Sequence, residues 1–151
     1  NRKARVAAFT RDDVFEIFEM RKLLEGRAAE LAAKELEDEA LESLQSEADY
    51  LAGSPDAVDW MQRWINHDEK FHDTIARATG VRRLWKDIAR YRLLHRGFNQ
   101  MSTNTKVLKQ ALQEHQQILG ALAKGDSKKA AETMVDHITT WQDYFVKNFP
   151  R

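Results

Sequence analysis

The sequence predicts an all-α fold, an antiparallel bundle of about six helices in one domain. Only six glycines and two prolines occur in 151 residues, so few positions would break a helix. Apolar residues recur at spacings of three and four along most of the chain, which places them on one face of a helix. Hydrophobic residues make up 42% of the chain, enough for one domain with a substantial core. Helices of this kind, joined by short connections, pack as a bundle.

The first two helices are expected over residues 10–36 and 38–52. In the first, Asp13 follows Thr10 at the third helical position, a weak form of the capping box that begins many helices. Asp38 should cap the second helix. The apolar face of the first helix carries Val14, Ile17, Phe18, Leu24, Ala28, Leu31 and Ala32, and that of the second carries Leu41, Leu44, Ala48 and Leu51.

The third helix is expected over residues 54–79. Ser54 is a suitable N-cap, and Pro55 suits the first helical position because its missing amide proton costs nothing there. Gly80 would end the helix. The predicted apolar face consists of Met61, Trp64, Ile65, Phe71, Ile75 and Ala76.

Three further helices follow. The polar residues 99–105 are expected to form a loop between the fourth and fifth helices. The fifth helix should end at Gly125, and Asp126 or Ser127 should cap the sixth. The apolar faces carry, in order, Leu84, Ile88, Tyr91, His95 and Phe98; Leu108, Ala111, Leu112, His115, Ile118, Leu119 and Leu122; and Ala130, Met134, His137, Ile138, Trp141 and Phe145.

Four polar side chains interrupt these apolar faces. Asp68 and His72 lie four residues apart on the third helix, one above the other on the same face. His115 and His137 interrupt the faces of the fifth and sixth helices. An ionised carboxylate buried without a partner would cost about 3 to 5 kcal/mol, so we expect a partner for Asp68.

The combination favours a divalent metal ion held by all four side chains. Three imidazoles and one carboxylate suit zinc or nickel, and also manganese or cobalt. Such a set leaves coordination positions free for water or an oxygen-donor ligand. The alternative pairs Asp68 with His72 in a buried hydrogen bond and leaves the other two histidines unrelated. His67 is expected at the surface, and His95, although on its apolar face, is not assigned as a ligand.

Arg21 interrupts the apolar face of the first helix. One interpretation pairs it with Glu25, one turn further on, as an ordinary ion pair at the helix surface. The other places its guanidinium in a cavity, where it would bind a carboxylate through two parallel hydrogen bonds. Arg92 and Arg96 are expected to be solvated.

Composition excludes several classes of protein. Lys+Arg and Asp+Glu both number 24, and this balance argues against a nucleic-acid or membrane-surface binder. The absence of cysteine excludes disulfides and thiolate sites. No apolar run reaches membrane-spanning length and no signal peptide is visible, so a cytoplasmic protein is expected.

Four segments together resemble the C-terminal effector domain, called FCD, of the FadR subfamily of GntR bacterial transcription regulators. They are VFEIFEMRKLLEGRAAELAA, HDEKFHDTIARATG, QEHQQILGALAKGD and AAETMVDHI, which follow the order and spacing of the family's motifs over almost the whole chain. In metal-containing members of this family, the matching aspartate and histidines hold a divalent metal. The resemblance assigns that role to Asp68, His72, His115 and His137 and places Arg21 near the effector's carboxylate.

The resemblance also implies the domain organisation and the partners. Residues 1–9 would be the remnant of a linker from a missing winged helix-turn-helix domain, and residues 10–151 the effector-binding and dimerisation domain. The protein would be a homodimer that binds a small carboxylate, and it would reach operator DNA only through the missing domain. It would not be an enzyme.

Two other functions remain open from the residues alone. One is a metal-dependent helical-bundle enzyme, either a hydrolase or an oxygenase. A di-iron site would need two Glu-x-x-His pairs, and only Glu69 with His72 fits. The other is a metal site with a purely structural role.

Overall fold

The computed structural model describes residues 9–99 and 103–150. Within these ranges the chain is all-α and contains no strand, as predicted. None of the helices in the described residues is long and apolar enough to cross a membrane. The helices are α1 (Arg11–Glu35), α2 (Asp38–Gly53), α3 (Trp60–Ala78), α4 (Arg82–Asn99), α5 (Thr105–Ala123) and α6 (Ser127–Lys147).

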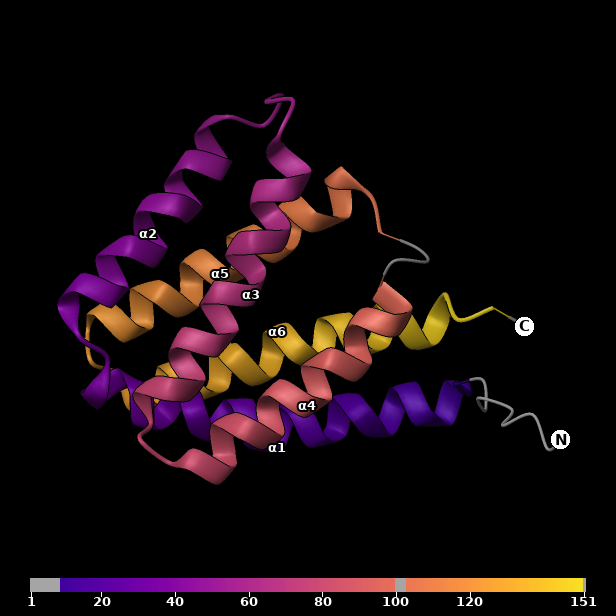
Figure 1. The fold of residues 1–151 in the computed structure, drawn as a ribbon, viewed down its shortest axis with the longest axis horizontal. Helices are drawn as coiled ribbons and strands as arrows, with labels where there is room; N and C mark the ends of the chain where they lie inside the picture. Colours follow the sequence, from indigo (N-terminus) through magenta and orange to yellow (C-terminus); the bar gives the residue numbers. More distant parts are fainter. Residues whose placement is uncertain (1–8, 100–102, 151) are drawn as a thin grey trace, which may run out of the picture.

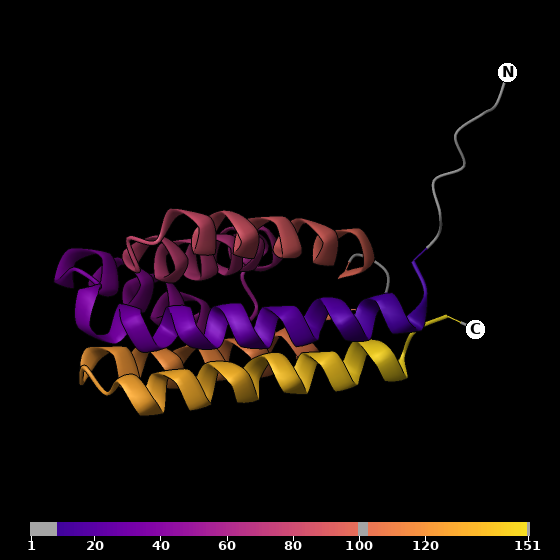
Figure 2. The same ribbon diagram turned by 90° about the horizontal axis from the view of Figure 1, so that it is seen from below.

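Helix α1 lies at the centre of the bundle. It runs antiparallel to α6, so the start of α1 and the end of α6 lie at the same end of the molecule (Figure 1). On its other side α1 packs against α3 and α4, and in Figure 2 it lies between α4 and α6. Helices α2 and α5 complete the bundle beside α3. The centre of the molecule is therefore enclosed by α1, α3, α4, α5 and α6.

The predicted start of α1 is confirmed, and its middle packs tightly against α6. The hydroxyl of Thr10 accepts a hydrogen bond from the amide of Asp13, whose carboxylate accepts one from the amide of Thr10. Further along, Gly26 allows the two helices to approach closely. A Cβ atom at this position would lie 2.8 Å from Cγ2 of Val135.

The predicted cap of α2 and the predicted start of α3 are wrong. Glu37, not Asp38, is the N-cap of α2, and its side chain makes no capping bond. Residues 54–59 form two turns before α3. The amide of Ala57 donates to the carbonyl of Ser54, and the amide of Trp60 donates to the carbonyl of Ala57. The indole of Trp60 then donates to the carbonyl of Leu51 at 3.0 Å. This bond and the burial of the ring set the beginning of α3 at Trp60, five residues later than predicted.

The buried face of α3 is rotated from the predicted one. Met61 and Ile65 are 38% and 48% exposed, whereas His67 is only 1% exposed. Trp60, Trp64, His67 and Phe71 follow one another at spacings of four, three and four, and these large rings face the core. The prediction that His67 lies at the surface is therefore wrong, because the two tryptophans outweigh the smaller Met61 and Ile65.

The ends of α3 and α5 and the start of α6 agree with the glycine and cap signals. Gly80 and Gly125 adopt φ values of +68° and +64°, the left-handed conformation that ends a helix. Asp126 caps α6, and Asn104 caps α5. Helix α4 continues through residue 99, which was expected in the loop. Residues 100–102, and residues 1–8 of the expected linker, lie outside the described parts of the chain.

A candidate metal centre beside a cationic pocket

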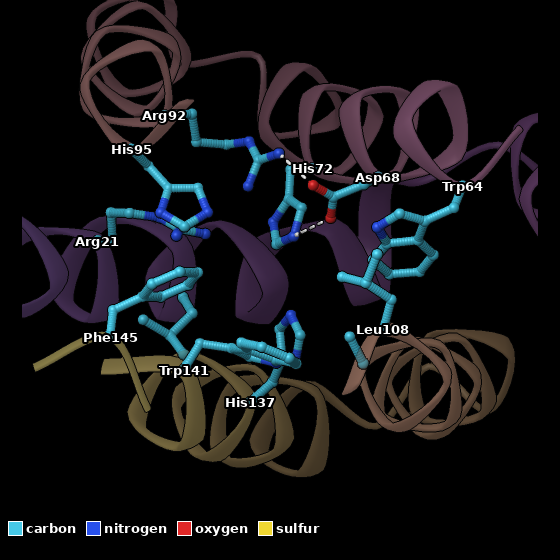
Figure 3. Close-up of a pocket in the computed structure, with 12 residues that line it drawn as sticks. Arg21, Trp64, Asp68, His72, Arg92, His95, Leu108, His137, Trp141 and Phe145 are labelled. Carbon is cyan, nitrogen blue, oxygen red and sulfur yellow. Dashed lines mark hydrogen bonds and ion pairs between the residues drawn. The ribbon is translucent and has the colours of Figure 1, made fainter. Parts of the chain in front are cut away.

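Three histidines from three helices meet at the centre of the bundle. His72 on α3, His115 on α5 and His137 on α6 are all buried, and each offers a ring nitrogen within 4.8 Å of the other two. Figure 3 shows His72 and His137 on opposite sides of the cavity. The apolar faces of the three helices carry these rings inward, so residues far apart in sequence become neighbours.

Two of the imidazoles are oriented by carboxylates, one buried (Glu25) and one partly buried (Glu114). Nδ1 of His72 lies 2.6 Å from Oε1 of Glu25, and Nδ1 of His137 lies 2.6 Å from Oε1 of Glu114. An ionised carboxylate can only accept, so each Nδ1 carries the proton and each Nε2 keeps its lone pair for another use. Burial raises the pKa of Glu25, but Arg21 and His72 outweigh it and hold that pKa well below its ordinary value.

His115 supplies the third nitrogen. Its Nδ1 lies 2.9 Å from Nε2 of His67, and its Nε2 has no hydrogen-bond partner among the described residues. A buried nitrogen without a partner costs about 1 to 3 kcal/mol. The lone pairs of three neighbouring imidazoles, one of them otherwise unused, fit the requirements of a divalent ion.

Asp68 places a carboxylate oxygen beside two of these nitrogens. Its Oδ1 lies 3.4 Å from Nε2 of His72 and 3.5 Å from Nε2 of His115. Its Oδ2 accepts from the guanidinium of Arg92 at 3.0 Å (Figure 3). Burial raises the pKa of Asp68, but Arg92 and His72 lower it more, so the carboxyl group is ionised. The structure thus brings together all four side chains that the sequence singled out.

The surroundings keep His115 and His137 neutral. Burial, with the neighbouring His137, lowers the pKa of His115 well below its ordinary value. Burial also lowers the pKa of His137, against the opposing effect of Glu114. Neutral imidazoles are the form that binds metal ions.

A small cavity of about 30 Å³ adjoins the histidines. Arg21, Arg92 and His95 line one side of it, and Trp64 and Leu108 line the other (Figure 3). A groove of about 360 Å³ between α3, α4 and the start of α5 is also lined by Arg92, His95, Trp64 and Leu108. The cavity alone has room for about one water molecule, and the groove adjoins it through these shared side chains.

Arg21 combines parts of both sequence interpretations. It pairs with Glu25, as the simpler interpretation has it, with 2.7 Å between Nε and Oε2. The pair is buried, however, and is not at the helix surface. Its guanidinium lines the cavity, beside His95 in Figure 3.

The prediction that Arg92 is solvated is wrong. Arg92 is 6% exposed, bonds Asp68, and lies 3.5 Å from Glu69. A signal was present in the sequence, because Arg92 follows Ile88 by four residues and precedes His95 by three. Arg96, which pairs with Glu69, is exposed as expected.

Sequence reasoning also missed the outer partners of the histidines. Glu25 and Glu114 were not assigned to His72 and His137, although Glu25 was considered as a partner of Arg21. Glu114 also accepts from the indole of Trp141 at 3.0 Å. These pairs join residues 23 to 47 positions apart, so helix periodicity alone could not find them.

The sequence matches a known protein family, and the fold matches solved structures. The model of the FCD domain family matches residues 16–140. No curated protein matches the sequence. Solved structures with a similar fold include two bacterial proteins. Escherichia coli McbR/YncC has a TM-score of 0.77 and 18% identity over 95% of this chain and 73% of its own. Streptococcus agalactiae GntR has a TM-score of 0.67 and 22% identity over 90% of this chain and 61% of its own.

Proposed function

The chain belongs to the FCD domain family, and on this basis we propose that it is the ligand-sensing and dimerisation domain of a transcription regulator. A small organic acid would bind at a divalent ion in the centre of the bundle. Residues 1–9 would link this domain to a DNA-binding domain that is not part of the chain, and that domain would read operator DNA. The protein would act as a cytoplasmic homodimer and not as an enzyme.

The observation that carries the proposal is the convergence of three imidazoles and a carboxylate. His72, His115, His137 and Asp68 would hold the ion, zinc or nickel in the first place and manganese or cobalt as alternatives. When bound, such an ion supplies a Lewis-acidic centre to which oxygen donors attach.

The charges around the cavity favour an anionic ligand. Glu25 and Asp68 bond the guanidinium groups of Arg21 and Arg92, and the carboxylate of Glu114 lies behind His137. These groups carry one net negative charge, which a divalent ion would change to one net positive charge. Because a buried charge is costly without a partner, a singly charged carboxylate would complete the balance.

The acid would use the groove as well as the cavity. A cavity of about 30 Å³ is too small for an organic acid, so the ligand would extend between α3, α4 and α5. There it would meet Arg92, which bridges α4 to Asp68 on α3. A ligand changes operator affinity only if it binds two arrangements of the dimer with different affinities, and a shift of α4 against α3 would supply that difference.

The enzyme alternative receives less support from the site. A metal-dependent hydrolase needs a general base beside the metal-bound water. Among the described residues that line the cavity, Asp68 is the only carboxylate, and it is a proposed ligand that also bonds Arg92. Glu25 and Glu114 are occupied by His72 and His137.

The proposal is tested by thermal unfolding of the metal-free and the zinc-loaded chain with acetate, lactate or succinate. We expect a carboxylate to raise Tm only when zinc is bound. Arg21→Lys keeps the charge but loses the planar fork, so it should weaken carboxylate binding about tenfold. Equal carboxylate effects with and without zinc would contradict the role of the ion. Zinc binding without any carboxylate effect would leave a purely structural site.

A further inference from the structure

The three histidines of the site differ in what orients them. His72 and His137 each donate from Nδ1 to a carboxylate, at 2.6 Å in both cases. The corresponding nitrogen of His115 instead faces another imidazole, Nε2 of His67, at 2.9 Å. His67 is not one of the four side chains of the proposed centre, and it is nevertheless almost completely buried.

Aromatic packing fixes the His67–His115 pair. Phe71 stacks on the ring of His115, with 3.8 Å between centroids and 6° between planes. Trp64 lies 5.8 Å from His67 and 5.1 Å from His115, measured between ring centroids. Neither imidazole is near water, so the hydrogen bond between them is the principal polar contact available to His67.

This hydrogen bond has two possible directions. If Nε2 of His67 donates, the proton of His115 must lie on Nε2, which then points at Oδ1 of Asp68, 3.5 Å away. If Nδ1 of His115 donates, the lone pair of its Nε2 faces the centre and is free to bind an ion.

We infer that His67 is a positioning residue of the metal centre: it accepts the Nδ1 proton of His115 and so directs the lone pair of Nε2 toward the ion. The inference rests on the proposed metal site and assigns a role to a residue outside the ligand set. In this state His67 carries its own proton on Nδ1. That nitrogen has no hydrogen-bond partner in the described part of the chain, whichever direction the bond to His115 takes.

Because His67 is neutral, it orients His115 without adding a negative charge to the site, as a carboxylate would. A carboxylate at this position, in addition to those of Asp68, Glu25 and Glu114, would cancel the net positive charge that remains once a divalent ion is bound. With His67, the third ligand is oriented without any change in charge. The site therefore keeps its attraction for an anionic ligand.

The test is a competition titration of the metal-free 151-residue chain with zinc. His67→Leu removes the acceptor and should weaken zinc binding about 10- to 100-fold, the usual effect of losing an outer partner. His67→Gln places an amide oxygen near the position of Nε2 and should keep the affinity within about threefold. Phe71→Leu removes packing from the same imidazole without touching the hydrogen bond, so its loss of affinity should be smaller than that of His67→Leu.

A second measurement reads the proton directly. Nitrogen-15 NMR of the zinc-loaded wild-type chain should show His67 protonated on Nδ1; protonation on Nε2 would overturn the inference. Zinc binding by His67→Leu equal to that of the wild type would overturn it too and leave the metal site standing. A wild-type chain that binds no zinc would overturn both the inference and the metal site.

Discussion

At the scale of single residues, burial keeps the imidazoles neutral and so determines how the metal-free chain responds to acid. The pKa values of His67, His115 and His137 all lie below the ordinary histidine value near 6.5. The unfolded chain therefore binds more protons than the folded chain once the pH falls below about 6.5. The contribution of these neutral imidazoles to the free energy of unfolding is fully present above that pH. It is lost as the pH falls toward their pKa values in the folded chain.

His67 allows this response to be measured at one position. Its pKa falls from 6.5 to about 4 on folding, so it alone should cost on the order of 2 kcal/mol of unfolding free energy between pH 7 and pH 5. Urea unfolding of the metal-free chain at several pH values measures the slope. His67→Gln should show a smaller slope than the wild type, and an unchanged slope would contradict the assigned pKa.

At the scale of helices, α1 and α6 depend on a residue without a side chain. A Cβ atom at Gly26 would lie 2.8 Å from Cγ2 of Val135, too close for two carbon atoms. We expect Gly26→Ala to destabilise the chain by about 1 to 3 kcal/mol, although alanine favours helices more than glycine does. Chemical denaturation measures the change. Val135→Ala in the same chain should restore much of the lost unfolding free energy. If the effects of the two substitutions simply add, residues 26 and 135 are not in contact.

Helices α3 and α4 are joined by ion pairs of two kinds. Arg92 and Asp68 form a largely buried pair at 3.0 Å, with side chains 7% and 18% exposed, whereas Arg96 pairs with Glu69 at the surface. Arg92→Leu would leave the carboxylate of Asp68 without its cation and should cost about 3 to 5 kcal/mol in the metal-free chain. Bound zinc would neutralise that carboxylate, so zinc should raise the Tm of Arg92→Leu more than that of the wild type.

The control for this experiment is Arg96→Leu, which breaks a pair between the same two helices. Its side chain is half exposed, so the loss should be no more than about 1 kcal/mol. Zinc should raise its Tm as much as it raises that of the wild type. The same zinc effect in both variants would argue that Asp68 does not lie beside the ion.

At the scale of the whole molecule, the sequence predicted the number and the order of the helices. The capping box at Thr10, the cap at Asp126 and the glycines at positions 80 and 125 are local signals, and local signals determine where most helices begin and end. The start of α3 was missed because a tertiary contact, the bond from the indole of Trp60 to the backbone of α2, determines it.

The candidate site, too, was predictable only where the signal is local to one helix. Asp68, His72 and His115 interrupt apolar faces, so periodicity identifies them as residues that point inward. His67 was expected at the surface because it lies off the predicted apolar face of its helix. The spacing of Arg92 from Ile88 and His95 did indicate an inward position, but Arg92 was expected to be solvated. The outer hydrogen bonds of the histidines depend on packing between helices, which a single sequence does not specify.

The central claim is that one ion lies where three imidazoles and the carboxylate of Asp68 converge. Anomalous X-ray diffraction from crystals of the zinc-loaded chain, recorded on both sides of the zinc edge, tests it most directly. The account predicts one anomalous peak per chain within about 2.0 to 2.2 Å of Nε2 of His72, His115 and His137 and of an oxygen of Asp68. A map with no peak among these residues, or with its peak on surface groups, would contradict it.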